Sequence, residues 1–172
     1  MPVGNLEFIK SASGSSVSSL SVTDCFSDKY DVYDITFNFA GNSASGYIDF
    51  RLLDSTGTEI SSAEYDIAGL MMRSYNTYIE NRAVNTTGYT IGYNQDFGLG
   101  GKLTIFNPYD SSSYTFLLNQ NAGGTTSAGQ LIGWKGIMTH KVAETISGIK
   151  FFVSGGGSYD FNYIEASVFG VK

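Results

Sequence analysis

Apolar and polar residues alternate strictly along residues 33–39, and this pattern constrains the fold more than any other feature of the chain. Successive side chains of a strand point to opposite faces, so one face carries only apolar groups. These are Tyr33, Ile35, Phe37 and Phe39. Residues 47–53 repeat the pattern, and the intervening segment 41–46 (GNSASG) is rich in turn-forming residues. The two segments are therefore predicted to form an antiparallel hairpin.

Eight further short segments have a similar character, each bounded by Gly, Ser, Asn or Asp. They span residues 6–10, 17–23, 89–93, 102–107, 114–120, 130–139, 146–153 and 161–171. About ten short strands predict antiparallel sheets packed face to face. The chain contains twelve Tyr, twelve Phe and one Trp. In a single sheet only one face of each strand would be covered, so one sheet cannot bury so many aromatic residues. We expect an all-β fold, an antiparallel, jelly-roll-like β-sandwich.

Residues 66–82 (DIAGLMMRSYNTYIENR) are the one stretch where a helix competes with a strand. The apolar spacing approximates a helical stripe. Gly69 interrupts that stripe, and the SYNTY sequence favours a strand followed by a loop. Both interpretations remain open here. The length of 172 residues fits one domain, which we expect over residues 15–172, with residues 1–14 as an N-terminal arm or edge strand.

Charge and cysteine content exclude several classes of function. Ten Lys and Arg against sixteen Asp and Glu give a net charge of −6, and no basic cluster exists, so nucleic-acid binding is not expected. No apolar run is long enough for a transmembrane helix, and the N-terminus does not resemble a secretory signal, so no membrane partner is expected. The single Cys25 cannot form an internal disulfide and is predicted to be a small buried side chain.

Catalytic and metal-binding motifs are not recognisable in the sequence. His140 is the only imidazole, and at the end of a predicted strand it is expected to be exposed or to cap that strand. Residues 54–59 (DSTGTE) faintly resemble a calcium loop but are better explained as a hairpin turn. One Cys and one His cannot supply the cluster that zinc usually needs. We expect no enzyme activity, no catalytic residue, no metal site and no cofactor.

The aromatic content exceeds what a small core requires, so some rings are expected on the surface. Exposed Tyr or Trp rings stack against sugars or lie at the centre of protein interfaces. Trp134, flanked by Gly133 and by Lys135-Gly136, is a candidate anchor of this kind. A Trp buried between two sheets explains the same sequence equally well.

Three stretches, taken in order, resemble segments of small β-rich virion structural proteins of tailed bacteriophages. They are residues 29–37 (KYDVYDITF) after a serine-rich lead-in, residues 101–108 (GKLTIFNP) followed by 111–114 (SSSY), and residues 146–151 (ISGIKF) together with the ending at 169–171. Phe169 and Val171 stand where the group commonly has Tyr and Ile. The resemblance covers about residues 15–171 and implies a β-sandwich displayed on a particle.

The resemblance implies a non-enzymatic virion component, assembled in the host cytoplasm, that binds the major capsid protein or other virion proteins. The chain starts at Met1 and supplies one domain, whereas a tail fibre usually adds a shaft, so a capsid decoration (cement) protein forming dimers or trimers is expected. The alternative is a tail-fibre or carbohydrate-binding module that recognises host glycans. Leu6, Phe8 and Ile9 either grip a neighbour's sheet edge or pack in the domain's own core.

Overall fold

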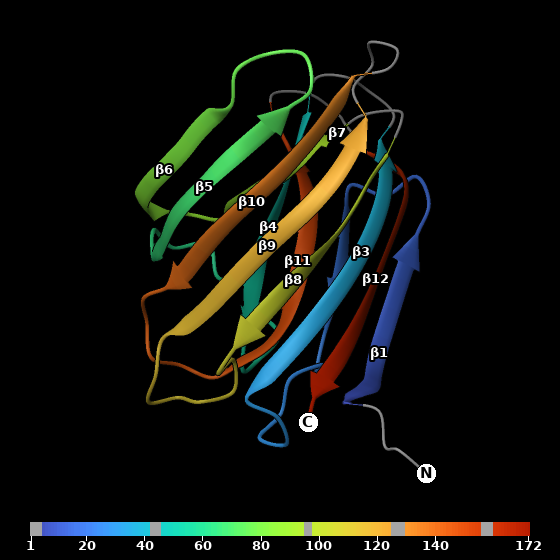
Figure 1. Cartoon of the computed structure of the whole chain (residues 1–172). Coiled ribbons are helices and arrows are strands. Elements are labelled where there is room, and N and C mark those ends of the chain that lie inside the picture. The colour runs from blue at the N-terminus through green and yellow to red at the C-terminus, as the bar shows by residue number, and fades with distance from the viewer. Residues whose placement is uncertain (1–4, 42–45, 95–97, 125–129, 156–159) are drawn as a thin grey trace.

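A computed structural model describes residues 5–41, 46–94, 98–124, 130–155 and 160–172. These residues form twelve strands in two antiparallel sheets and contain no helix, so the predicted β-sandwich is confirmed (Figure 1). No described segment is a helix long and apolar enough to cross a membrane.

The large sheet has eight strands and the small sheet has four. The order in the large sheet is β1 (Leu6–Gly14), β12 (Phe161–Val171), β3 (Val32–Gly41), β8 (Leu99–Phe106), β9 (Thr115–Gly124), β10 (Leu131–His140), β5 (Tyr65–Arg73) and β6 (Ile79–Thr86). The order in the small sheet is β2 (Ser19–Val22), β11 (Ile146–Ser154), β4 (Gly46–Asp54) and β7 (Tyr89–Asn94). Residues 6–14 are thus an edge strand of the large sheet, paired with β12.

The hydrophobic core lies between the two sheets. The alternation along residues 33–39 holds, because Tyr33, Ile35, Phe37 and Phe39 are all buried. Phe37 of the large sheet contacts Phe151 of the small sheet, with ring centroids 5.7 Å apart. Each such side chain stabilises the fold by about 1.5–3 kcal/mol when it leaves water. The predicted burial of Cys25 is also confirmed, at 2% exposed.

The predicted hairpin between residues 33–39 and 47–53 is wrong. β3 pairs with β12 and β8 in the large sheet, whereas β4 pairs with β11 and β7 in the small sheet. Alternation identifies a strand with one buried face, but it does not identify the strand's hydrogen-bonded neighbour. Here the two apolar faces meet across the core, so the chain changes sheets between them.

Residues 66–82 are strand and loop, and the helical alternative is wrong. They contribute most of β5 and the start of β6, which pair with each other and raise the number of strands above the expected ten (Figure 1). Gly69 lies in β5 opposite Gly136 of β10. An ideal Cβ at Gly69 would lie 3.1 Å from the carbonyl oxygen of Lys135, so a small residue suits this closely packed part of the sheet.

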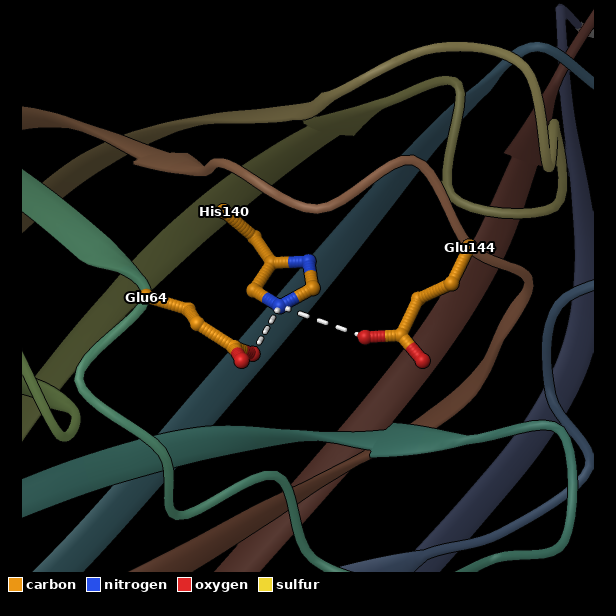
Figure 2. Close-up of side chains that lie close together, drawn as sticks. All are labelled: Glu64, His140 and Glu144. Carbon is orange, nitrogen blue, oxygen red and sulfur yellow. Dashed lines mark hydrogen bonds and ion pairs between the residues drawn. The ribbon is translucent and has the colours of Figure 1, made fainter.

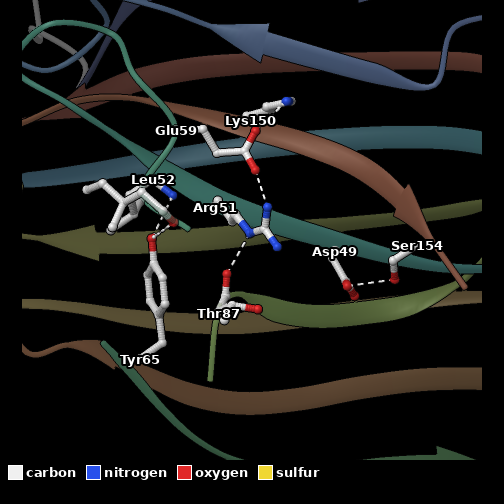
Figure 3. Close-up of polar contacts among 9 residues, drawn as sticks. Asp49, Arg51, Leu52, Glu59, Tyr65, Thr87, Lys150 and Ser154 are labelled. Carbon is white, nitrogen blue, oxygen red and sulfur yellow. Dashed lines mark hydrogen bonds and ion pairs between the residues drawn. The ribbon is translucent and has the colours of Figure 1, made fainter. Parts of the chain in front are cut away.

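The segment 54–59 forms the expected turn. Asp54 Oδ1 accepts hydrogen bonds from the backbone N–H groups of Thr56 and Thr58, at 2.8 and 2.9 Å, and Gly57 has a φ of 79°. Glu59 is held by both Arg51 and Lys150 (Figure 3). Both carboxylates of this segment therefore have partners within the protein, in keeping with a turn rather than a calcium loop.

Candidate functional site: the outer face of the large sheet

The central strand β9 points hydrophobic side chains away from the core. Phe116 and Leu118 are 45% and 47% exposed, whereas Asn119 and Asn121 face the interior and are buried. The Asn121 amide donates to the carbonyl of Ile91 on β7 at 2.7 Å, and its Oδ1 accepts from the backbone N–H of Trp134 at 3.0 Å. Because the buried amides are hydrogen-bonded in the interior, this face of β9 must point inward. Phe116 and Leu118, on the opposite face, must therefore point outward.

Strand register extends this apolar surface across neighbouring strands. Leu118 lies opposite Ile137 of β10, and Ile137 lies opposite Ala68 of β5. Ile137 is 58% exposed. Directly opposite side chains on one face of antiparallel strands touch, so these residues form a continuous row.

A groove of about 820 Å³ lies on this outer face, over β8, β9, β10 and β5. These four strands lie side by side in front of the small sheet in Figure 1. The walls of the groove are mainly apolar. The residues that line it are Ala68, Leu70, Met72, Lys102, Thr104, Leu118, Asn119, Gln120, Lys135 and Ile137, with glycines 69, 101 and 136. We call it the outer groove.

Two lysines add positive charge to the outer groove of this acidic chain. Lys102 forms an ion pair with Asp34 of β3 at 2.7 Å. Lys135 lies opposite Gln120 and Leu70 and forms no ion pair with any residue that the structure describes. The outer groove therefore combines an apolar floor with one uncompensated cation.

The large and small sheets approach closely behind the outer groove. Gly69 and Gly136 lie opposite each other on the inner face, and an ideal Cβ at Gly136 would lie 2.2 Å from the Tyr89 hydroxyl oxygen of β7. Burial raises the pKa of that Tyr89 hydroxyl. The absence of side chains at the glycine pair makes room for the tyrosine, so Tyr89 packs directly behind the groove.

The residues predicted to contact partners are placed as follows. Leu6 and Phe8 of β1 are 52% and 58% exposed, while Ile9 is half-buried and packs against the core. The Phe8 ring contacts Phe169 of β12, with centroids 5.8 Å apart. β1 is thus part of its own sheet, with its outer edge open.

Trp134 is buried, so of its two interpretations the structure shows the interior one. It is 5% exposed and packs in a small cluster with Met71 and Ile132. The outward position of Leu118 and Ile137 was not predicted from the sequence. The sequence does contain a signal for them. In segments 114–120 and 130–139, apolar residues occur at both odd and even positions, which indicates that both faces of these strands carry apolar side chains.

A second cluster lies at one end of the sandwich, around His140. The imidazole Nε2 lies 3.4 Å from Glu64 Oε2 and 3.5 Å from Glu144 Oε1, and the two carboxylates approach it from different segments (Figure 2). His140 is completely buried, which contradicts the expected exposed position at a strand end. Like Trp134 and Met138, His140 lies at an even-numbered position of β10, and these side chains point inward. β10 ends at His140, one residue later than predicted.

Electrostatics at this cluster are unfavourable for two ionised carboxylates. Burial raises the pKa of Glu144 above its ordinary value; His140 opposes this shift, and the negative charges of Glu64 and Asp54 reinforce it. Neither Glu64 nor Glu144 forms an ion pair with a Lys or Arg among the described residues.

No protein-family model matches this chain, and no curated protein matches it.

Proposed function

We propose that this protein is a non-enzymatic virion structural protein, a capsid decoration protein that binds neighbouring shell subunits through the outer groove. The observation that carries the proposal is the orientation of β9, which exposes Phe116 and Leu118 while it buries two asparagines. Contiguous exposed apolar surface commonly marks a binding site for another protein. The resemblance to phage virion proteins supplies the class of partner.

The lining of the outer groove favours a protein partner over a glycan. Sugar rings stack best on flat aromatic faces, but none of the described residues that line the groove is aromatic. Trp134, the residue best suited to stacking, lies beneath the sheet. The partner surface that fits is an apolar protrusion with a carboxylate positioned to meet Lys135.

Stabilisation of the shell follows from mass action. A protein that binds the assembled shell, but not its free subunits, shifts the equilibrium toward the assembly. The buried area must approach that of a specific interface, about 800 Å² on each partner. A rigid sandwich suits this role because little conformational entropy is lost on docking.

The test measures binding of the purified protein to undecorated shells by co-sedimentation. Leu118→Asp and Ile137→Asp each place a charge in the outer groove, and we expect at least a tenfold loss of binding with an unchanged circular dichroism spectrum. The matched control is Val84→Asp, because Val84 of β6 is 70% exposed and does not line the groove. Equal binding by all three variants would refute the groove as the contact.

The carbohydrate-binding alternative makes a different prediction, which needs one more variant, Tyr114→Ala. Tyr109 and Tyr114, which are 41% and 47% exposed, are among the exposed rings that lie outside the outer groove. Glycan binding that is lost on Tyr114→Ala but retained in Leu118→Asp would support the alternative and contradict the decoration role.

A further inference from the structure

We propose that Glu64, His140 and Glu144 form a binding site for a divalent transition-metal ion such as Zn²⁺. Their ligand atoms all lie within 4.8 Å of one another. The site is at one end of the sandwich and shares no residue with the outer groove. It is therefore independent of the proposed shell contact.

The fold brings these three residues together from separate segments. His140 ends β10 and lies opposite Tyr65, the first residue of β5, so Glu64 arrives beside it. The backbone N–H of Lys141 donates to the Glu64 carbonyl at 2.9 Å and fixes this junction. Glu144 comes from the connection to β11, whose first residue, Ile146, donates to the carbonyl of Pro108 at 2.7 Å.

The distances from His140 Nε2 to the two carboxylates are longer than good hydrogen bonds and suit two ligands of one metal ion. The distances of 3.4 and 3.5 Å from His140 Nε2 exceed the usual 2.7–3.2 Å of an N–H···O bond. Tetrahedral zinc with bonds of 2.0–2.1 Å separates its ligands by about 3.3–3.4 Å, which nearly equals both distances. Figure 2 shows both carboxylates converging on the same imidazole nitrogen.

The charge balance points in the same direction. Several other carboxylates are neutralised by lysine or arginine, as Glu59 is by Arg51 and Lys150 and Asp66 is by Lys141. Among the described residues, the imidazole of His140 is the only basic group that pairs with Glu64 and Glu144. A divalent cation bound between them neutralises both charges without another side chain.

Access and ligand type set the expected metal and affinity. The imidazole is fully buried, but each carboxylate is 34% exposed, so an ion reaches Nε2 past the two glutamates. One nitrogen and two oxygen ligands without a thiolate suit Zn²⁺, Co²⁺ or Mn²⁺ and leave one position for water. His140 Nδ1 has no hydrogen-bond partner among the described residues, and this missing support weakens metal sites about 10- to 100-fold. We therefore expect an affinity in the micromolar range.

The experiment titrates tag-free protein with ZnCl₂ by isothermal calorimetry at neutral pH. We expect one ion per chain and at least a tenfold weaker affinity in Glu64→Gln and in Glu144→Gln. Both substitutions keep the side-chain shape and avoid the fully buried His140, whose replacement endangers folding. Glu80→Gln is the matched control, because Glu80 is an exposed acid on β6.

Co²⁺ supplies an independent readout, because its visible absorption reports nitrogen and oxygen coordination. We expect an absorption band with wild type and Glu80→Gln and none with the two cluster variants at the same Co²⁺ concentration. Absence of binding up to 1 mM Zn²⁺, unchanged affinity in both cluster variants, or equal affinity for Ca²⁺ would each overturn the proposal.

Discussion

At the scale of single residues, Gly136 decides how closely the two sheets pack. A Cβ there would lie 2.2 Å from the Tyr89 hydroxyl and 2.9 Å from the Ala68 carbonyl oxygen. We predict that Gly136→Ala lowers the free energy of unfolding by about 1–3 kcal/mol, the usual cost of overpacking. Gly100→Ala is the control, since the nearest atom to its Cβ is 3.7 Å away. Equal stability of the two variants in urea unfolding would contradict this account.

Cys25 provides a second prediction at this scale. Burial raises the pKa of its thiol to about 12, so almost no thiolate exists near neutral pH. We predict that the native protein does not react with a thiol reagent at pH 8, whereas the unfolded protein reacts with one equivalent. Rapid labelling of the native protein would show that Cys25 is not shielded by the core.

Residue patterns predicted the core well and the polar cluster poorly. Alternation identified the buried face of residues 33–39, because a two-residue period reports burial directly. The meeting of Glu64 with His140 was not predictable, because it depends on the pairing of β10 with β5 across more than seventy residues. The orientation of β9 was likewise not predictable from hydrophobicity alone, because Asn119 and Asn121 face the core while Phe116 and Leu118 face outward.

At the scale of strands, Glu59 links the turn after β4 to the exposed side of the small sheet. Burial raises the pKa of its carboxyl, but Lys150 and Arg51 outweigh that effect and hold it below its ordinary value of 4.5 (Figure 3). A carboxyl pKa lowered by folding stabilises the native state above the unfolded pKa, and this stabilisation is lost as the pH falls through the folded pKa.

The corresponding prediction compares wild type with Glu59→Gln in urea unfolding. We expect wild type to be more stable by about 1 kcal/mol at pH 7, which is typical of a partly exposed ion pair. The difference should shrink toward zero between about pH 5 and pH 3, because the wild-type carboxylate becomes protonated there. A difference that is the same at both ends of this range would contradict the ion-pair account.

Strand pairing explains why the predicted hairpin failed while the strands themselves were found. Segments 33–39 and 47–53 each have one apolar face that must be buried. Both faces can be buried whether the two strands lie in the same sheet or in two different sheets. The pairing of β3 with β12 joins residues that are at least 120 positions apart in the sequence. Such contacts depend on the whole sheet, so local turn residues did not reveal them.

At the scale of the whole molecule, the sandwich divides its surfaces between two proposed roles. The outer groove of the large sheet is proposed to bind another protein, and the Glu64–His140–Glu144 cluster is proposed to bind a metal at one end. The two sites share no residue. A substitution in one is therefore expected to leave the other intact, which allows the two proposals to be tested separately.

Electron cryo-microscopy of the intact particle tests the central claim most directly. The account predicts density for this protein at icosahedral positions on the shell, with β9, β10 and β5 turned toward the capsid subunits. Density confined to the tail would contradict it, as would copies on the shell whose outer groove faces solvent.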